Sequence, residues 1–146
     1  MSKLADALRA ALNAARKAQQ KDRILVLGTI LANVKNRDLE LGRVPTDDEV
    51  VEVLRKGIKI RREAYEQYSA AQRADLAGVE LGQVKILEEF LPPAAEPAEI
   101  RAAARAAIEA GAKDVGKVMG VVMPQFKGRA EGKLINQIVR EELQAG

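Results

Sequence analysis

The sequence predicts an all-α fold, and three observations support this prediction. Apolar residues recur every three or four positions through most of the 146-residue chain, which is the period of an amphipathic helix. Alanine and leucine, both strong helix formers, dominate these segments. No alternating apolar and polar run longer than four or five residues indicates a strand. We therefore expect two helical subdomains, a multi-helix domain over residues 1–91 and a small three-helix tail over residues 98–146, joined by a proline-rich linker over residues 92–97.

The first two helices are expected to form an antiparallel hairpin. The first runs from about Ser2 to Gln19, and the second begins near Asp22. Because only Gln20 and Lys21 separate them, we expect the two helices to pack as an antiparallel hairpin. Their apolar stripes consist of Leu4, Leu8, Ala11, Leu12, Ala15 and Ala18 in the first helix and of Ile24, Leu27, Leu31 and Val34 in the second.

A turn over residues 41–45 precedes the third helix, whose start carries a capping box. Thr46 can accept a hydrogen bond from the third helical N–H while Glu49 reaches back to the backbone of Thr46. Arg61 is a charged exception at the spacing of the buried face. A fourth helix is expected from about residue 73 to residue 90. The expected buried face of the third helix consists of Val50, Leu54, Ile58, Tyr65 and Tyr68.

The proline-rich linker comprises residues 92–97, which contain three prolines. Proline lacks the N–H and restricts the preceding residue, so no helix can cross this segment, and we expect it to be exposed. Three short helices follow, over residues 98–110, 114–126 and 130–143. Gly111 and Gly128 are the expected stops of the first two, and the Met-Pro pair at 123 and 124 should tighten the end of the middle one.

The composition excludes most enzyme chemistry. The chain contains no cysteine, histidine or tryptophan, and its only Ser and Thr hydroxyls are those of Ser2, Ser69, Thr29 and Thr46. A serine or cysteine nucleophile with a histidine base cannot be assembled, and neither can a thiolate or imidazole metal site. Acid pairs such as Asp47-Asp48 and Glu88-Glu89 occupy expected cap or surface positions. We therefore expect no catalytic residue, no metal site and no cofactor.

The overall charge is mildly basic, with 24 Lys and Arg against 21 Asp and Glu, a net charge of +3 and a pI near 9.3. This excess is too small to indicate a nucleic-acid binder without a clustered distribution. The chain shows no pattern of a signal peptide and no apolar run of membrane-spanning length. These features predict a cytoplasmic protein that does not contact membranes.

The most basic window is residues 55–62, which holds five positive charges and no acid. Arg55, Lys59 and Arg62 share one helix face and could follow a row of phosphates. Glu52, Glu63 and Glu66 lie near enough to neutralise part of this face. A solvated, ion-paired helix surface and a contact patch both remain open.

The second basic window is residues 113–133, where five cations meet only Asp114 and Glu131. At its centre, residues 126–130 end one predicted helix and open the next. A helix start exposes unpaired N–H groups that favour phosphate. Gly128 as a simple helix stop beside a solubilising arginine is the other interpretation. The candidate RNA-binding residues in this window are Lys113, Lys117, Lys127, Arg129 and Lys133.

Two runs of sequence carry a resemblance to a known family. The first is Gly42-Arg43-Val44-Pro45-Thr46-Asp47-Asp48-Glu49-Val50, followed by Leu54, Lys59, Arg61-Arg62 and Tyr68. The second is Lys113-Asp114-Val115-Gly116-Lys117-Val118-Met119-Gly120, followed by Met123-Pro124, Lys127-Gly128-Arg129-Ala130, Gly132-Lys133-Leu134 and Asn136. Together with Glu88-Glu89-Phe90-Leu91-Pro92, they resemble the YqeY family over nearly the whole chain.

The resemblance implies a family-specific helical domain followed by a domain similar to the tail of the B subunit of tRNA-dependent glutamine amidotransferase. In that enzyme the tail contacts tRNA, whereas amide transfer belongs to parts absent here. The segment from Val118 to Asn136 carries this similarity. Within it, Lys127 and Arg129 are the residues whose chemistry fits contact with an RNA backbone.

Three functions follow as hypotheses. The first is a non-catalytic module that binds structured RNA, with tRNA the expected ligand. The second is an amidotransferase-associated factor that acts in an aminoacylation or amidation complex, with carbon-nitrogen ligase activity and glutamine as amide donor only within that complex. The third is a stand-alone enzyme with glutamine as amide donor. It is the weakest of the three, because the chain offers no Cys or His nucleophile system.

Overall fold

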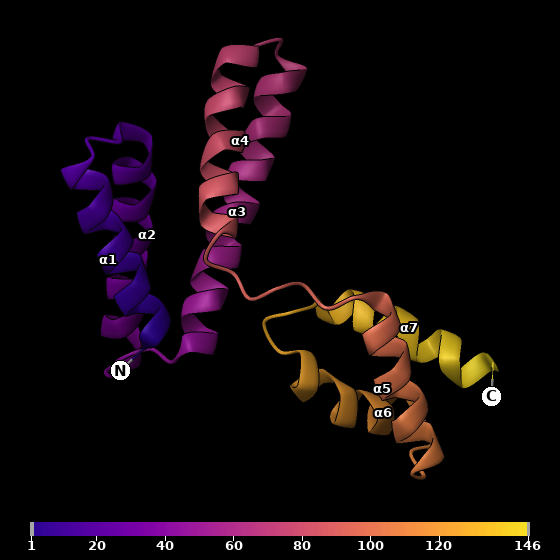
Figure 1. Cartoon of the computed structure of the whole chain (residues 1–146). Coiled ribbons are helices and arrows are strands. Elements are labelled where there is room, and N and C mark those ends of the chain that lie inside the picture. The colour runs from indigo at the N-terminus through magenta and orange to yellow at the C-terminus, as the bar shows by residue number, and fades with distance from the viewer. Residues whose placement is uncertain (1, 146) are drawn as a thin grey trace. The chain divides into compact units, whose positions relative to one another are not determined.

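The structure is a computed structural model that describes residues 2–145, and Figure 1 shows these residues as helices joined by turns and by a longer extended segment between α4 and α5. No strand occurs in this part of the chain, so the all-α prediction is confirmed. Most helix boundaries lie within two residues of the predicted ones. The helices are α1 (Lys3–Lys17), α2 (Lys21–Leu41), α3 (Asp47–Ala70), α4 (Ala74–Glu88), α5 (Pro97–Glu109), α6 (Val115–Val122), the 3₁₀ helix η1 (Met123–Phe126) and α7 (Gly132–Ala145).

Contacts along the chain divide it into two compact units, Met1–Leu91 and Pro92–Gly146. Each unit encloses its own apolar cluster. That of the N-terminal unit is built mainly from leucine, isoleucine and valine of α1 to α4, including the fully buried Leu8, Leu27, Leu54 and Leu87. That of the C-terminal unit is built from α5, α6, η1 and α7, including Ile100, Val118 and Ile135.

The N-terminal unit consists of two helical hairpins. Helix α1 packs against α2, as expected from their short connection, and α3 packs against α4. Helix α2 ends at Leu41 and is capped by Gly42, whose φ of 69° is left-handed and therefore suits glycine. Helix α2 also contacts α3 and α4, and this arrangement places apolar residues of all four helices in one core.

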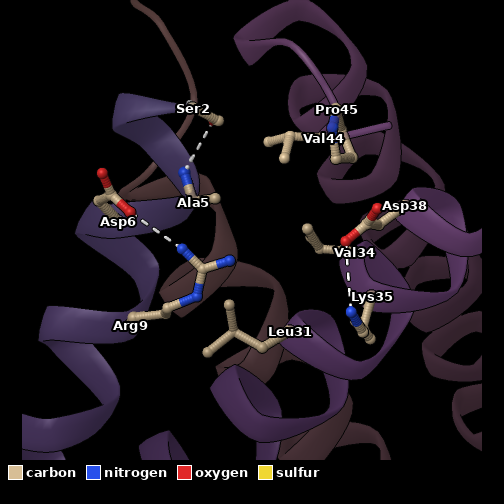
Figure 2. Close-up of a pocket in the computed structure, with 10 residues that line it drawn as sticks. All are labelled: Ser2, Ala5, Asp6, Arg9, Leu31, Val34, Lys35, Asp38, Val44 and Pro45. Carbon is tan, nitrogen blue, oxygen red and sulfur yellow. Dashed lines mark hydrogen bonds and ion pairs between the residues drawn. The ribbon is translucent and has the colours of Figure 1, made fainter. Parts of the chain in front are cut away.

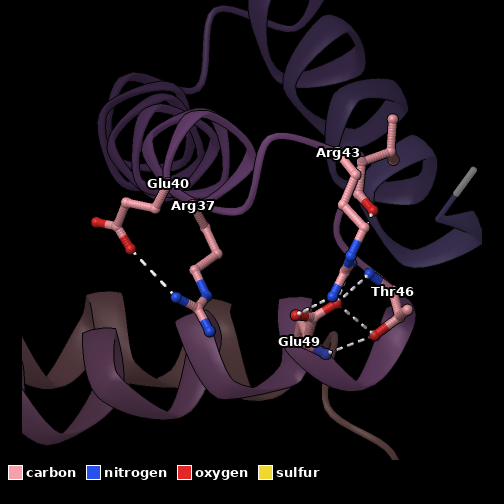
Figure 3. A network of polar contacts seen from close by, with 6 residues as sticks. Arg37, Glu40, Arg43, Thr46 and Glu49 are labelled. Atoms are coloured by element: carbon pink, nitrogen blue, oxygen red, sulfur yellow. Dashed lines mark hydrogen bonds and ion pairs between the residues drawn. The ribbon is translucent and has the colours of Figure 1, made fainter.

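The predicted capping box at the start of α3 is present. The Thr46 hydroxyl accepts a hydrogen bond from the Glu49 N–H at 3.3 Å, and the Glu49 carboxylate accepts one from the Thr46 N–H at 3.0 Å. Figure 3 shows that Arg43 joins this cap through an ion pair of 2.7 Å with Glu49. Donation by Arg43 and by the Thr46 N–H lowers the pKa of Glu49 to about 2. The cap therefore holds its carboxylate ionised well into the acid range.

The start of α1 is tied to the start of α3. The buried Ser2 hydroxyl caps α1 by accepting a hydrogen bond from the Ala5 N–H and donates its own proton to the Asp47 carboxylate. The Leu4 N–H donates to the same carboxylate at 3.1 Å. These bonds, with the Ser2 hydroxyl as the largest cause, lower the pKa of Asp47. Asp47 is therefore the first residue of α3 and also binds the start of α1, a role beyond the simple cap predicted for it.

The three helices of the C-terminal unit pack against one another, and the proline-rich segment packs with them. Ala95 is buried, and its N–H donates to the Arg129 carbonyl at 2.8 Å. The expectation of an exposed linker over residues 92–97 is therefore wrong at Ala95, and Pro97 already belongs to α5. The middle helix tightens into η1 at the Met-Pro pair, as predicted.

Candidate nucleic-acid interface

The turn between η1 and α7 was expected to offer unpaired N–H groups to phosphate. The N–H groups of Arg129 and Ala130 both donate to the Phe126 carbonyl, at 2.8 and 3.1 Å. Gly128 adopts a φ of 78°, which reverses the chain so that these bonds can form. Helix α7 begins at Gly132, two residues after the predicted start. The amides at 129 and 130 are thus already paired, and this part of the prediction is wrong.

Arg129 is bound within its own unit and does not extend freely into solvent. Its guanidinium pairs with Glu99 at 3.0 Å, donates to the Pro93 carbonyl at 3.2 Å and lies 5.9 Å from the centre of the Phe126 ring. Its side chain is 34% exposed. Arg129 therefore fastens the proline-rich segment and α5 to the turn, which is more than the solubilising role that the sequence left open for it.

The lysines of the same window are differently placed. Lys113, Lys117, Lys127 and Lys133 are all exposed. Within residues 2–145, the ammonium groups of Lys113, Lys117 and Lys133 form no ion pair. The carboxylate of Asp114 accepts the Lys117 backbone N–H at 2.9 Å and caps α6. Lys113, Lys117 and Lys133 therefore present charges to solvent that no acid within residues 2–145 pairs.

The basic window of α3 is partly neutralised from a neighbouring helix. Arg62 pairs with Glu88 of α4 at 3.3 Å, although the sequence suggested acids of its own helix. Arg55 is half-buried, and Lys59 is exposed. The three residues do share a helix, but Arg62 is engaged across the hairpin, so this face presents less free charge than the lysines of the C-terminal unit.

A network of arginine and glutamate between α5 and α7 was not foreseen. Glu142 is only 7% exposed and accepts hydrogen bonds from Arg105 at 2.8 Å and from Arg101 at 3.2 Å. Arg101 also pairs with Glu141 at 2.8 Å. The bond from Arg105 is the largest cause that lowers the pKa of Glu142. The i, i+4 spacing of the two arginines was visible in the sequence, but the register between α5 and α7 was not.

Two hollows of the N-terminal unit are lined by residues of α2. One of about 240 Å³ lies between α1, α2 and the turn before α3, and Figure 2 shows its wall of Leu31, Val34, Val44 and Pro45. Its charged groups pair with each other, Arg9 with Asp6 and Lys35 with Asp38. The other hollow lies between α2 and α3 and is polar.

Metal-ligating groups and membrane-spanning helices are two further features that bear on function. No group of three or more acidic side chains within residues 2–145 is arranged to hold a metal ion. Among the helices between residues 2 and 145, none combines the length and the hydropathy needed to cross a membrane.

Comparison with known proteins identifies the family. A family model described as Yqey-like protein matches residues 5–143. An uncharacterized protein of Schizosaccharomyces pombe, C22F3.15, is 39% identical over 79 residues, which make up 54% of this chain and 64% of that protein. The chain thus spans somewhat less than two thirds of this relative's length. Because the family model covers nearly the whole chain, the protein belongs to the YqeY family.

Proposed function

We propose that the C-terminal unit is a non-catalytic module that binds the backbone of structured RNA, with tRNA as the expected ligand. One observation carries this proposal. Lys113, Lys117 and Lys133 are exposed within one short stretch and form no ion pair within residues 2–145, and Lys127 is exposed in the same stretch. The arginines of the unit are engaged in bonds within it.

Physical chemistry favours the backbone over the bases as the target. Lysine acts as a point charge toward phosphate and carries no sequence information. Recognition of unpaired bases needs exposed aromatic rings for stacking, and Phe126, the aromatic residue of this unit, is buried. A-form RNA is read mainly through its shape and its phosphates. The lysine cluster fits this mode.

The test is a double substitution, Lys117→Gln with Lys133→Gln. Each lost phosphate contact reduces the magnitude of the salt slope by roughly 0.7 to 0.9. We expect tRNA affinity to fall by about one to two powers of ten near physiological salt, with unchanged helicity and melting because both side chains are exposed. Filter binding or fluorescence anisotropy over a salt series measures both quantities.

The matched control is Lys21→Gln with Lys85→Gln, which removes the same charge from exposed positions of the N-terminal unit. Arg129→Gln is a poor probe, because it also breaks the bonds to Glu99 and Pro93. Equal losses in the two double variants would overturn the proposal. So would wild-type binding of tRNA no stronger than that of an unrelated protein of equal charge, and a role within an amidation complex would then be the better explanation.

A further inference from the structure

The polar hollow between α2 and α3 has the properties of a binding site for a small molecule. Its volume is about 480 Å³, within the range of about 300 to 1,000 Å³ that is usual for ligand pockets. Both helices contribute side chains able to form hydrogen bonds. They are Asn33, Asn36, Arg37 and Glu40 from α2 and Glu52, Lys56 and Arg61 from α3.

Arg61 places a positive charge in the wall of this hollow and forms no ion pair within residues 2–145, although the carboxylate of Glu80 is near enough to favour its charged form. Its Nε donates to the Gln83 side-chain oxygen at 2.9 Å and one terminal nitrogen donates to the Gly57 carbonyl at 3.0 Å, so both partners are neutral. Burial is the largest cause that lowers the pKa of Arg61. A guanidinium has five N–H donors, so Arg61 keeps donors beyond these two bonds.

Other donors surround the same space. The amides of Asn33 and Asn36 lie one helical turn apart on α2, and the Lys56 ammonium is exposed on α3. Within residues 2–145 none of these three side chains forms a hydrogen bond or ion pair. Arg37 extends from α2 toward α3 in Figure 3 and pairs with Glu40 at 3.2 Å. The hollow thus combines two cations, Lys56 and Arg61, with two neutral donors, and none of the four forms an ion pair within residues 2–145.

We propose that the groove between α2 and α3 binds a small phosphate monoester, with Lys56 and Arg61 as the cationic donors and Asn33 and Asn36 as the neutral donors. Donors from two helices suit a phosphate, because its three terminal oxygens point in different directions and carry a charge of about −1.5 to −2 near pH 7. Glu52, also without a partner among the described residues, accepts from a hydroxyl of the esterified part. All of these residues lie in the N-terminal unit, so the proposal is independent of the RNA proposal.

The side-chain amides of asparagine provide a direct readout by nuclear magnetic resonance. The chain has four asparagines, of which Asn33 and Asn36 line the groove and Asn13 and Asn136 lie on α1 and α7. Titration of ¹⁵N-labelled protein with adenosine monophosphate and with glucose 6-phosphate should shift the amide signals of Asn33 and Asn36 saturably. The signals of Asn13 and Asn136 should stay in place, and adenosine without phosphate should shift none of them.

A pair of variants separates a site from general attraction by charge. Lys56→Gln removes a groove donor and should weaken binding of either monoester by roughly tenfold, the typical effect of a lost charge-assisted hydrogen bond. Lys59→Gln removes an equal charge from an exposed position of the same helix that does not line the groove, and it should leave binding unchanged. Circular dichroism of both variants checks that α3 remains intact.

Three results would overturn the proposal. The first is the absence of saturable shifts at Asn33 and Asn36 with millimolar monoester. The second is an equal loss of affinity in Lys56→Gln and Lys59→Gln. The third is a shift of these amides by tRNA but not by either monoester, which would assign the groove to phosphates of an RNA backbone.

Discussion

The two units of the chain use charged side chains in different ways. In the N-terminal unit many ion pairs are exposed and several are local, such as Arg9 with Asp6 and Arg37 with Glu40. In the C-terminal unit Arg101, Arg105 and Arg129 join segments far apart in sequence, whereas Arg140 bonds Asn136 within its own helix. Among residues 2–145 the buried charged side chain is Glu142, which lies in this unit and binds arginines of α5.

This difference indicates which interactions stabilise each of the two helical units. Exposed ion pairs typically contribute only about 0 to 1 kcal/mol to stability. The larger unit, with four helices around one core, relies on apolar burial. Both units have long-range arginine pairs, but only in the smaller unit do they meet at a buried carboxylate among residues 2–145, that of Glu142. The planar group of arginine can bind two acceptors at once. In this unit Arg101, Arg105 and Arg129 serve the fold, whereas Lys113, Lys117 and Lys133 form no ion pair within residues 2–145.

The largest expected effect comes from a cavity in one core. Leu54 is fully buried in the N-terminal unit, so Leu54→Ala should reduce the free energy of unfolding of that unit by about 2 to 5 kcal/mol. If the two units are independent, amide hydrogen exchange should accelerate in α1 to α4 and stay unchanged in α5 to α7. Ile135→Ala is the mirror experiment in the C-terminal unit. Accelerated exchange in both units from either variant would show that the two units unfold as one cooperative body.

The second prediction concerns the cross-link that Arg101 and Arg105 of α5 form with Glu142 of α7. Glu142→Gln keeps the size of the side chain but removes the charge that Arg101 and Arg105 share, so it should lower the melting temperature of the C-terminal unit. Glu141→Gln is the matched control, since Glu141 is 43% exposed, forms an ion pair with Arg101 and otherwise accepts a hydrogen bond from the neutral Gln137. Differential scanning calorimetry should show a clearly smaller change for the control. Equal changes would show that burial of Glu142 adds nothing to the cross-link.

The smallest effect concerns acid stability at the cap of α3. The folded-state pKa of Glu49 is about 2, below its ordinary value of 4.5. Its stabilisation is therefore complete above about pH 4.5 and is lost as the pH falls toward 2. Urea midpoints of wild type and Glu49→Gln should differ at neutral pH and converge near pH 2. A difference that stays constant across this range would show that ionisation of Glu49 does not stabilise the cap.

Local signals in the sequence were enough to predict the helices. Thr46 and Glu49 mark the start of α3 by their own spacing, and the structure shows their reciprocal hydrogen bonds. The short connection after α1 likewise predicted the first hairpin. These predictions succeed because caps and turns depend on residues within one or two helical turns of each other.

Partners between helices could not be predicted in the same way. Arg62 pairs with Glu88 and Arg129 with Glu99, each across many residues of chain. Such pairs depend on the register at which two helices pack, and a single sequence does not contain it. The same limit explains the error at the turn after η1, where Gly128 folds the following amides onto Phe126. The candidate phosphate groove was also invisible, although Arg61 stood out as a charge on a buried face.

Gly57 lies where the groove between α2 and α3 meets the core of the N-terminal unit. This buried glycine lines the hollow, and a Cβ atom there would lie 2.7 Å from Cδ1 of Ile30 and 3.6 Å from Cδ1 of Leu87. A larger residue would therefore have to displace the end of the Ile30 side chain, and overpacked cores typically lose about 1 to 3 kcal/mol of stability. Because Gly57 lines the hollow and Ile30 belongs to the core, a substitution that changes the hollow at this position also requires the core to repack.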